Sequence, residues 1–243
     1  MDGVDGVDGV DGVDGVDGVD GVDGLRESGM DNRIRVLLLL TLVGGFADAG
    51  AFVLLGTFTG HITGNAVLAM IYLAQGRWLT LGYCAVALVC FLLGTYWGSR
   101  WRLRRMTDSD TRRIAPLLSL QLLLMLSGVG LWRWGCPSGF ILLQALALGL
   151  QNGVIQSLHT TKVHSTYITG MSTSLINSLA AGRTAPDRPA RATLLCGIMG
   201  FVGGALLGGT LTDRFGAVGF IAVCIPLLAA TLLSRRLGGA PEG

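Results

Sequence analysis

The chain has 243 residues, of which 51% are hydrophobic and only 14% are charged, and its mean hydropathy is +0.59. Soluble domains carry about a quarter charged residues, so this composition excludes an ordinary soluble fold. The formal net charge is only +2, and the arginines are not set in a folded basic domain, so we expect no nucleic-acid partner.

The first 24 residues are a low-complexity tract in which Asp-Gly-Val repeats seven times from Asp2 to Val22. Gly and Asp are poor formers of helices and strands, and the tract cannot bury a core, so we expect disorder over residues 1–29. Met30 begins the sequence MDNRIRVLLLL, which is typical of the start of a bacterial membrane protein. Both Met1 and Met30 stay candidates for the natural start.

Six apolar runs follow, and each is close to the length of about 20 residues that spans a bilayer. They cover residues 34–56, 79–98, 114–132, 139–158, 191–211 and 217–234. The runs are rich in glycine, which lets helix backbones approach closely in lipid. The sequence therefore predicts an all-α, polytopic membrane helical bundle with six spans.

Asp48, in the motif GGFADAG, is the only acidic residue inside a predicted span. A carboxylate at membrane depth is costly, and it usually faces a cavity or a partner. One interpretation is a group that exchanges protons. The other is a protonated or hydrogen-bonded carboxylate with a structural role.

The first span ends at a polar break, and the apolar segment after it is short. Residues 62–76 give about 22 Å of helix against a hydrocarbon core of about 30 Å, so we expect a re-entrant segment. A Thr-Gly pair at a helix start offers free backbone N–H groups and the positive end of the helix dipole, which suit an anion or a carboxylate. The candidate site residues of this break are His61, Thr63, Gly64 and Asn65.

The same segment recurs in the second half of the chain. Thr57–Arg77 and Val163–Arg183 align without a gap, with identities at Ile62/Ile168, Thr63/Thr169, Gly64/Gly170, Leu73/Leu179, Ala74/Ala180, Gly76/Gly182 and Arg77/Arg183. The flanks Leu92–Trp101 and Leu206–Phe215 also match. Two related halves are common among transporters. We therefore expect a membrane domain over residues 30–243, with halves over about 33–113 and 114–236.

The second break adds Thr169 and Gly170 to the candidate site, and capping of their own helices is the alternative role of Thr63 and Thr169. Gln151 and Asn152 are further candidates, because polar side chains at membrane depth either line a path or join helices. Aligning Gly45 with Gly149 places Asp48 opposite Asn152. Asn152, Gln156 and His159 fall near one helical face.

The positive-inside rule favours six spans over eight. With the two short segments re-entrant and the N-terminus inside, the outside keeps only Arg77, Arg133 and Arg214. With eight spans, the basic residues would divide almost evenly. An odd number of spans in each half makes the repeats inverted.

Two motifs resemble the YoaK-like bacterial membrane proteins, the family of domain of unknown function 1275. GGFADAGAFVLLGTFTGHITGN (44–65) is similar to its first signature, and LGLQNGVIQSL (148–158) followed by STYITG (165–170) is similar to its second. The resemblance covers residues 33–236 and implies a multi-pass protein of the bacterial cytoplasmic (inner) membrane. The motif positions are Asp48, Ala49, Thr63, Gly64, Asn65, Gln151, Asn152, Thr169 and Gly170.

Motifs of serine hydrolases, zinc proteases, P-loop proteins and dinucleotide-binding enzymes are missing from the sequence, so we expect neither an enzyme nor a cofactor or metal. The leading hypothesis is a transporter or channel for a small solute, with membrane lipids as partners and a homo-oligomer left open. The alternative is a non-transporting membrane scaffold, assembly partner or lipid-interacting protein.

Overall fold

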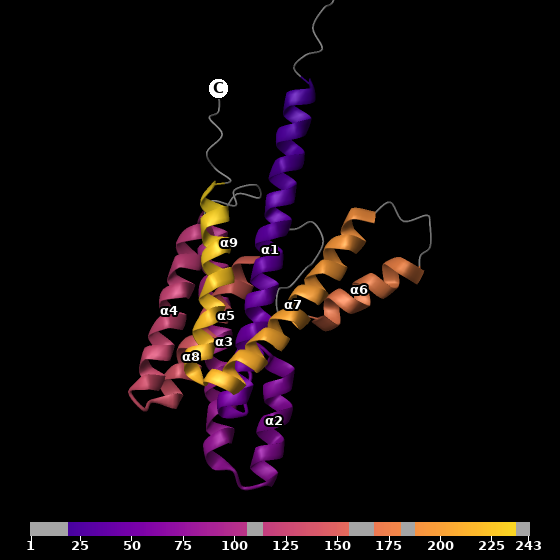
Figure 1. Cartoon of the computed structure of the whole chain (residues 1–243). Helices are drawn as coiled ribbons and strands as arrows, with labels where there is room; N and C mark the ends of the chain where they lie inside the picture. The colour runs from indigo at the N-terminus through magenta and orange to yellow at the C-terminus, as the bar shows by residue number, and fades with distance from the viewer. Residues whose placement is uncertain (1–18, 106–113, 156–167, 181–187, 237–243) are drawn as a thin grey trace, which may run out of the picture.

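The computed structural model describes residues 19–105, 114–155, 168–180 and 188–236, with side chains from 34 onward and without those of 188–190 and 236. These residues form helices and the short turns between them (Figure 1). The helices are α1 (Val19–Leu55), α2 (Ile62–Ala74), α3 (Trp78–Arg105), α4 (Ala115–Arg133), α5 (Pro137–Ile155), α6 (Ile168–Ala180), α7 (Arg188–Phe215), α8 (Ala217–Phe220), η3 (Ile221–Val223) and α9 (Cys224–Arg236).

Six segments of the described chain are long and apolar enough to cross a membrane. They are Ile34–Leu55, Trp78–Arg105, Ala115–Arg133, Pro137–Ile155, Arg191–Phe215 and Ala217–Arg235. The last of them joins α8, η3 and α9. Each segment coincides with one of the six predicted apolar runs, so the predicted polytopic helical bundle is confirmed. The two short segments form α2 and α6, which have 13 residues each and begin at the aligned residues Ile62 and Ile168.

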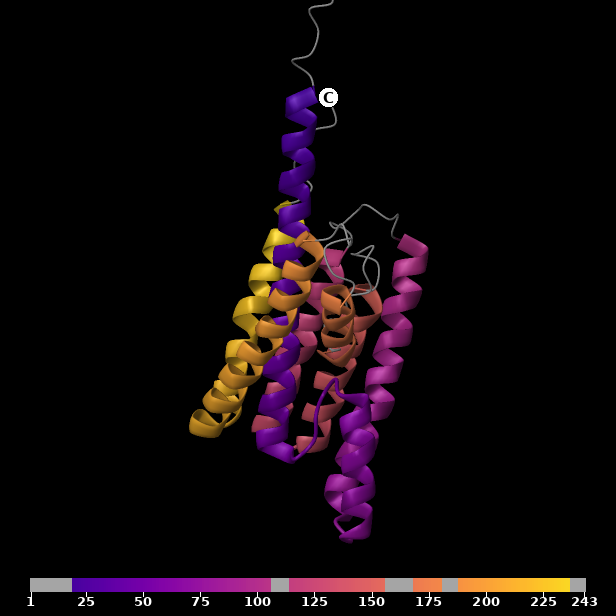
Figure 2. The ribbon, with the colours of Figure 1, turned by 90° about the vertical axis from the view of Figure 1, so that its right-hand side faces the viewer.

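The start of α1 differs from the prediction. Disorder was expected over residues 1–29, whereas α1 begins at Val19 and includes the end of the Asp-Gly-Val tract. This part of α1 projects beyond the other helices (Figures 1 and 2). Once the apolar part of a helix has formed, each further residue fixes one backbone hydrogen bond without a new nucleation cost, so a helix can extend past its packed part.

The bundle is built from two tightly packed helix pairs. α1 packs along α7, and α3 packs along α5. A second helix covers each pair, because α9 lies against α1 and α4 lies against α5, and α4 and α9 also meet. The short helices follow the same scheme, with α2 on α3 and α6 on α7. The contacts that α1 to α4 make thus have counterparts in the contacts that α5 to α9 make.

Glycine sets the close approach of α3 and α5. A Cβ atom added at Gly94 would clash with the backbone carbonyl of Leu146, and one added at Gly149 would clash with that of Phe91. The two backbones are therefore in direct contact, as small residues allow in membrane helices.

The same arrangement occurs between α1 and α7. A Cβ atom added at Gly204 would clash with the backbone carbonyl of Leu42, and one added at Gly45 would clash with that of Phe201. In the α3–α5 pair, Gly94 occupies the place that Gly204 occupies here. The flank alignment, which matches Gly94 with Gly208, is therefore one helical turn out of register. Backbone contact fixes the register, and a run with many glycines does not reveal which of them makes that contact.

Aromatic rings fill the centre between the two pairs. Phe220 of α8 packs edge-on against Phe46 of α1 at 6.1 Å between ring centroids, and against Phe140 of α5 at 5.1 Å. All three side chains are buried. Apolar side chains that face outward are numerous, as expected for a surface in contact with lipid.

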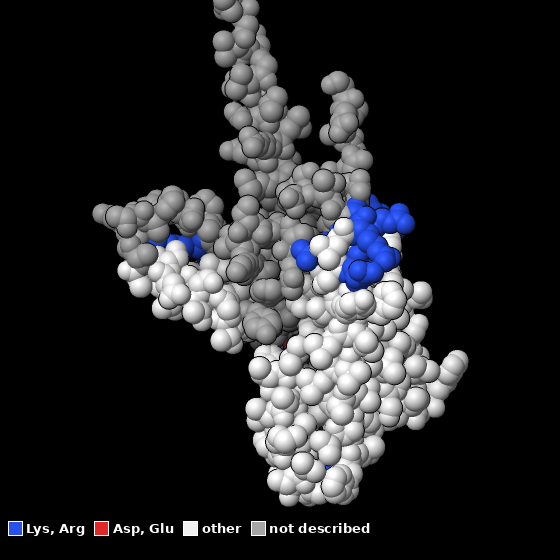
Figure 3. All heavy atoms as spheres, turned by 180° about the vertical axis from the view of Figure 1, so that it is seen from behind, with Lys and Arg blue, Asp and Glu red and all other residues white. Residues whose placement is uncertain are grey.

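The arginines divide between the two ends of the bundle. Among the residues with described side chains, most arginines lie at the end from which α1 projects, called here the basic end (Figure 3). Its arginines with described side chains are Arg35, Arg100, Arg102, Arg104, Arg105, Arg191 and Arg235. The opposite end carries Arg77 in the turn after α2, and Arg133 and Arg214 in the last turns of α4 and α7. This is the division that the six-span arrangement predicts.

Candidate functional site

The break between α1 and α2 turns the chain back into the bundle. Gly56 follows α1 with a φ of 67°, a conformation that a glycine adopts without strain. Residues 57–61 then run back alongside α1, and α2 returns toward the end that α1 had reached (Figure 2). The segment is therefore re-entrant, as predicted, and non-helical backbone lies inside the fold.

Asp48 of α1 holds the middle of this break. Its Oδ1 atom accepts hydrogen bonds from the backbone N–H of Thr59 at 2.9 Å, the Thr59 hydroxyl at 2.8 Å and the backbone N–H of Gly60 at 2.6 Å. Backbone groups that cannot reach water at membrane depth need such partners. Asp48 is also the only buried charged residue in the described part of the chain.

The second carboxylate oxygen of Asp48 is in a different situation. Its Oδ2 atom is buried and has no hydrogen-bond partner among the described residues. The imidazole of His61 lies beside it, with its Nδ1 atom 3.8 Å from Oδ2 and its side chain 39% exposed. One oxygen of Asp48 thus supports the backbone, while the other faces a half-exposed imidazole.

Asn65 of α2 clamps the start of the break. Its Oδ1 atom accepts hydrogen bonds from the Thr57 hydroxyl at 3.0 Å and from the backbone N–H of Phe58 at 2.9 Å. Its Nδ2 group donates to the backbone carbonyl of Phe58 at 2.7 Å. The Tyr72 hydroxyl donates to the carbonyl of Gly56 at 2.7 Å. Side chains from two helices therefore satisfy the break.

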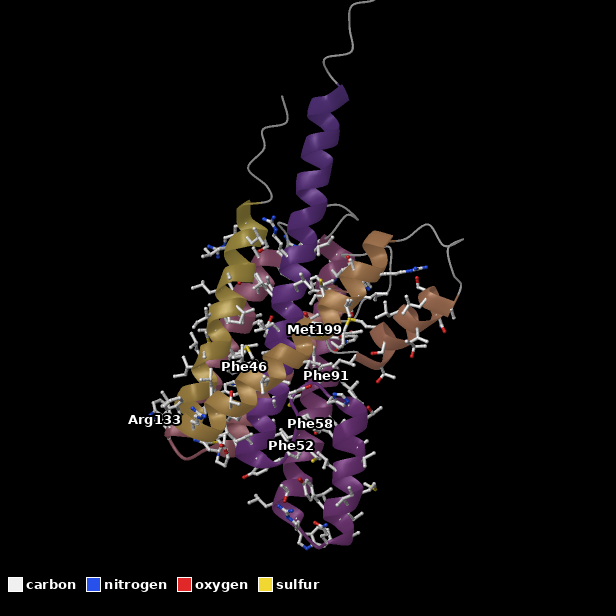
Figure 4. All side chains as sticks on the ribbon, turned by 45° about the vertical axis from the view of Figure 1, so that its right-hand side comes forward. Phe46, Phe52, Phe58, Phe91, Arg133 and Met199 are labelled. Atoms are coloured by element: carbon white, nitrogen blue, oxygen red, sulfur yellow. The ribbon has the colours of Figure 1, made fainter. Side chains whose placement is uncertain are left out.

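Aromatic rings enclose the break on its outer side. The Phe58 ring stacks on Phe52 of α1 with centroids 4.9 Å apart (Figure 4). On its other side the Phe58 ring lies 5.4 Å from the imidazole of His61. His61 is thus held between Asp48 and an aromatic ring.

The predicted capping role of Thr63 is wrong. His61 occupies the N-cap of α2 and makes no side-chain capping bond, whereas Thr63 is the second residue of the helix and is exposed. Gly64 packs against the rings of Phe58 and His61. Capping fails because the helix begins at Ile62, two residues earlier than a cap at Thr63 requires, and the Thr63 side chain is exposed.

The candidates of the second half lie elsewhere in the bundle. Thr169 and Gly170 occupy the second and third positions of α6, as Thr63 and Gly64 do in α2. Gln151 is buried and donates from Nε2 to the carbonyl of Leu40 at 3.0 Å. The Oε1 atom of Gln151 accepts a bond from Gln121 at 2.6 Å, so Gln151 joins α1, α4 and α5.

Asn152 is buried near the end of α5. Because Gly149 makes the contact in α5 that Gly45 makes in α1, the packing places Asn152 at the position that Asp48 holds in α1. Gln156 and His159 lie outside the described residues. The structure therefore brings together Asp48, His61, Gly64 and Asn65 around one break, whereas Gln151 belongs to a different set of hydrogen bonds and Thr169 and Gly170 lie at the start of α6.

A family model described as "Protein of unknown function (DUF1275)" matches residues 36–233, which is most of the chain. The chain belongs to this family. The resemblance seen in the sequence is thus confirmed. No curated protein and no solved structure matches the chain. The six apolar spans make the chain a polytopic helical membrane protein, and the family description leaves its activity open.

Sequence reasoning missed the residues that Asp48 and Asn65 hold. Thr57, Thr59 and Gly60 lie in the break itself, and Tyr72 lies nearly three turns into α2. The threonines stand at alternate positions before the helix, a pattern that could have indicated extended backbone with hydroxyls on one side. No group of three or more His, Cys, Asp or Glu side chains that could hold a metal ion lies within the described residues.

Proposed function

We propose that this membrane protein is a transporter or channel for a small solute, and that Asp48 is the group that exchanges a proton or cation. The observation behind the proposal is the unpaired Oδ2 atom of a buried carboxylate. Buried ionisable groups in membrane segments are rare, and they mark ion and substrate paths. The three bonds to Oδ1 keep the carboxylate in place while Oδ2 is left to a ligand.

His61 is the connection between Asp48 and the surface. Its imidazole is half-exposed and its Nδ1 atom lies 3.8 Å from Oδ2, a gap that a small shift of the ring or one water molecule would close. An imidazole can accept a proton at one ring nitrogen and donate one from the other, which suits a proton shuttle. In this scheme a proton reaches Asp48 through His61.

Corresponding helix contacts are the second support for transport. The pairs α1–α7 and α3–α5 make the same glycine contacts, and α2 and α6 are both short helices of 13 residues. We infer an inverted repeat, in which α1 to α4 correspond to α5 to α9. This places the division between the halves in the turn after Arg133, whereas the sequence suggested residue 113. Discontinuous helices at a repeat interface are the sites of many transporters.

The basic end is proposed to face the cytoplasm, and the membrane is proposed to be the bacterial inner membrane. The positive-inside rule places arginine-rich loops and helix ends on the cytoplasmic side. The break at Asp48 then opens from the outer side, because α1 and α2 both end at the opposite end (Figure 2).

Transport is tested with Asp48→Asn in proteoliposomes that contain a pH-sensitive dye. Asparagine keeps an oxygen for the three bonds to Thr59 and Gly60 and removes the charge. Amino acids, sugars and organic acids are added outside one at a time. We expect at least one compound to change the internal pH with the natural protein and to give no change with Asp48→Asn.

Thr63→Ser is the matched control, because it removes only a methyl group from an exposed side chain in the first turn of α2, and Asp48 is left unchanged. An equal pH response by Asp48→Asn would exclude Asp48 as the exchanging group. A transport signal that is lost equally in the control would assign the effect to disturbance of the break.

A second candidate function is a non-transporting membrane scaffold. Gln151 favours it, since this buried side chain only joins three helices. The three bonds to Oδ1 also suit a structural carboxylate. On this reading no compound in the panel produces flux, and Asp48→Asn changes thermal stability alone.

A further inference from the structure

The outward face of α3 changes its character along the helix. Val89 and Leu93 are exposed and apolar, Tyr96 and Trp97 follow one turn later, and Arg100 comes next. These positions are spaced by three or four residues, so they share one face of the helix. The face thus runs from apolar side chains through aromatic rings to a cation at the basic end.

A surface pocket of about 430 Å³ lies at the basic end of this face. The described residues that line it are Tyr96, Trp97, Arg100, Trp101, Arg104 and Arg105. The Tyr96 and Trp97 rings pack edge-on at 6.0 Å, and the Arg105 guanidinium lies 5.5 Å over the ring of Trp101. The pocket therefore has aromatic walls and three guanidinium groups.

We propose that this pocket binds the headgroup of an anionic phospholipid. Arginine forms paired hydrogen bonds with phosphate oxygens, and tyrosine and tryptophan favour the level where headgroups meet acyl chains. The exposed Val89 and Leu93 lie below the pocket, where acyl chains would lie. This continuity with an apolar face indicates a lipid rather than a free phosphate ion.

The corresponding helix does not carry this combination. α7 packs on α1 as α3 packs on α5, and by the glycine register Leu206, Leu207 and Thr210 of α7 stand where Tyr96, Trp97 and Arg100 stand in α3. Helix packing alone therefore does not require the aromatic and basic residues of α3. The site belongs to the leaflet at the basic end.

The test is native mass spectrometry of the full-length protein in detergent with added dioleoyl phosphatidylglycerol. The variant R100Q/R104Q removes two exposed charges from the pocket. The control R133Q/R214Q removes two exposed charges from the opposite end (Figure 4 labels Arg133). We expect the affinity for phosphatidylglycerol to fall about thirtyfold in the pocket variant, given about 1 kcal/mol for each arginine near an anionic surface, and to stay unchanged in the control.

Two further measurements distinguish an anionic lipid from other sources of a phosphate group. Dioleoyl phosphatidylcholine is expected to bind weakly, and inorganic phosphate is expected not to displace phosphatidylglycerol. An equal loss of affinity for phosphatidylglycerol in the two double variants would overturn the site. Binding of phosphatidylcholine as strong as that of phosphatidylglycerol would overturn it as well. Displacement by inorganic phosphate would overturn the assignment to lipid. Because all these substitutions are on exposed side chains, the thermal midpoint of each variant serves as the check of folding.

Discussion

At the scale of single residues, the function proposed for Asp48 depends on the different surroundings of its two oxygens. Oδ1 satisfies three donors of the break, and Oδ2 remains unpaired beside His61. The sequence offered a structural carboxylate and an exchanging carboxylate as alternatives. In the proposed function Oδ1 takes the structural role and Oδ2 the exchanging role, so the alternatives do not exclude each other.

Asp48→Ala is expected to destabilise the protein strongly, while Asp48→Asn is expected to remain close to the natural protein. Alanine leaves the donors of Thr59 and Gly60 without an acceptor, at about 1–3 kcal/mol for each buried group. The measurement is the thermal midpoint of the two variants in the same detergent. Equal midpoints for Asp48→Ala and Asp48→Asn would show that the break does not depend on Oδ1.

At the scale of elements, each helix pair is held by backbone contact at glycine. Gly204 lies on the carbonyl of Leu42, whereas its neighbour Gly203 has nothing within 4 Å of an added Cβ. The two residues share the same helix and the same local sequence. Alanine substitutions at these two positions therefore separate the effect of packing from the helix propensity of alanine.

Gly204→Ala is therefore expected to destabilise the protein by about 1–3 kcal/mol, the usual cost of overpacking, because α1 and α7 must move apart. Gly203→Ala is expected to be neutral or slightly stabilising, because alanine is the better helix former. Unfolding in detergent with increasing denaturant measures both. A similar loss of stability in Gly203→Ala would mean that glycine content, and not contact with α1, sets the stability.

At the scale of the whole molecule, the division of the arginines and the return of α2 define the topology. Arg77 and Arg133 share one end, and Arg235 lies at the other. Eight spans would place Arg77 on the same side of the membrane as Arg235. The proposed transport site depends on this arrangement, since it needs a break that enters and leaves from one side.

Single cysteines test this arrangement in a background in which Cys84, Cys90, Cys136, Cys196 and Cys224 are replaced by alanine. Arg77→Cys and Ser138→Cys are expected to react with a membrane-impermeant thiol reagent added outside intact cells. Arg235→Cys is expected to react only after the membrane is opened. Eight spans would place Arg77, Ser138 and Arg235 on the same side, so identical labelling of all three cysteines before the membrane is opened would contradict the six-span fold.

The sequence by itself determined the spans, the two short helices and the two ends of the bundle. Length, hydropathy and arginine position are local properties, and the way each segment inserts into the bilayer depends on its own values of them. It also identified Asp48, His61 and Asn65, because polar groups stand out in an apolar chain.

Only the tertiary structure decided what these residues do. Asp48 meets Thr59 and Gly60 because the break folds back on α1, and Gln151 joins three helices because α1, α4 and α5 converge on it. The helix register likewise follows from backbone contact at Gly94 and at other glycines that look alike in sequence. Hydrogen bonds and close packing depend on which segments become neighbours in space, and these neighbours cannot be read from the order of residues along the chain.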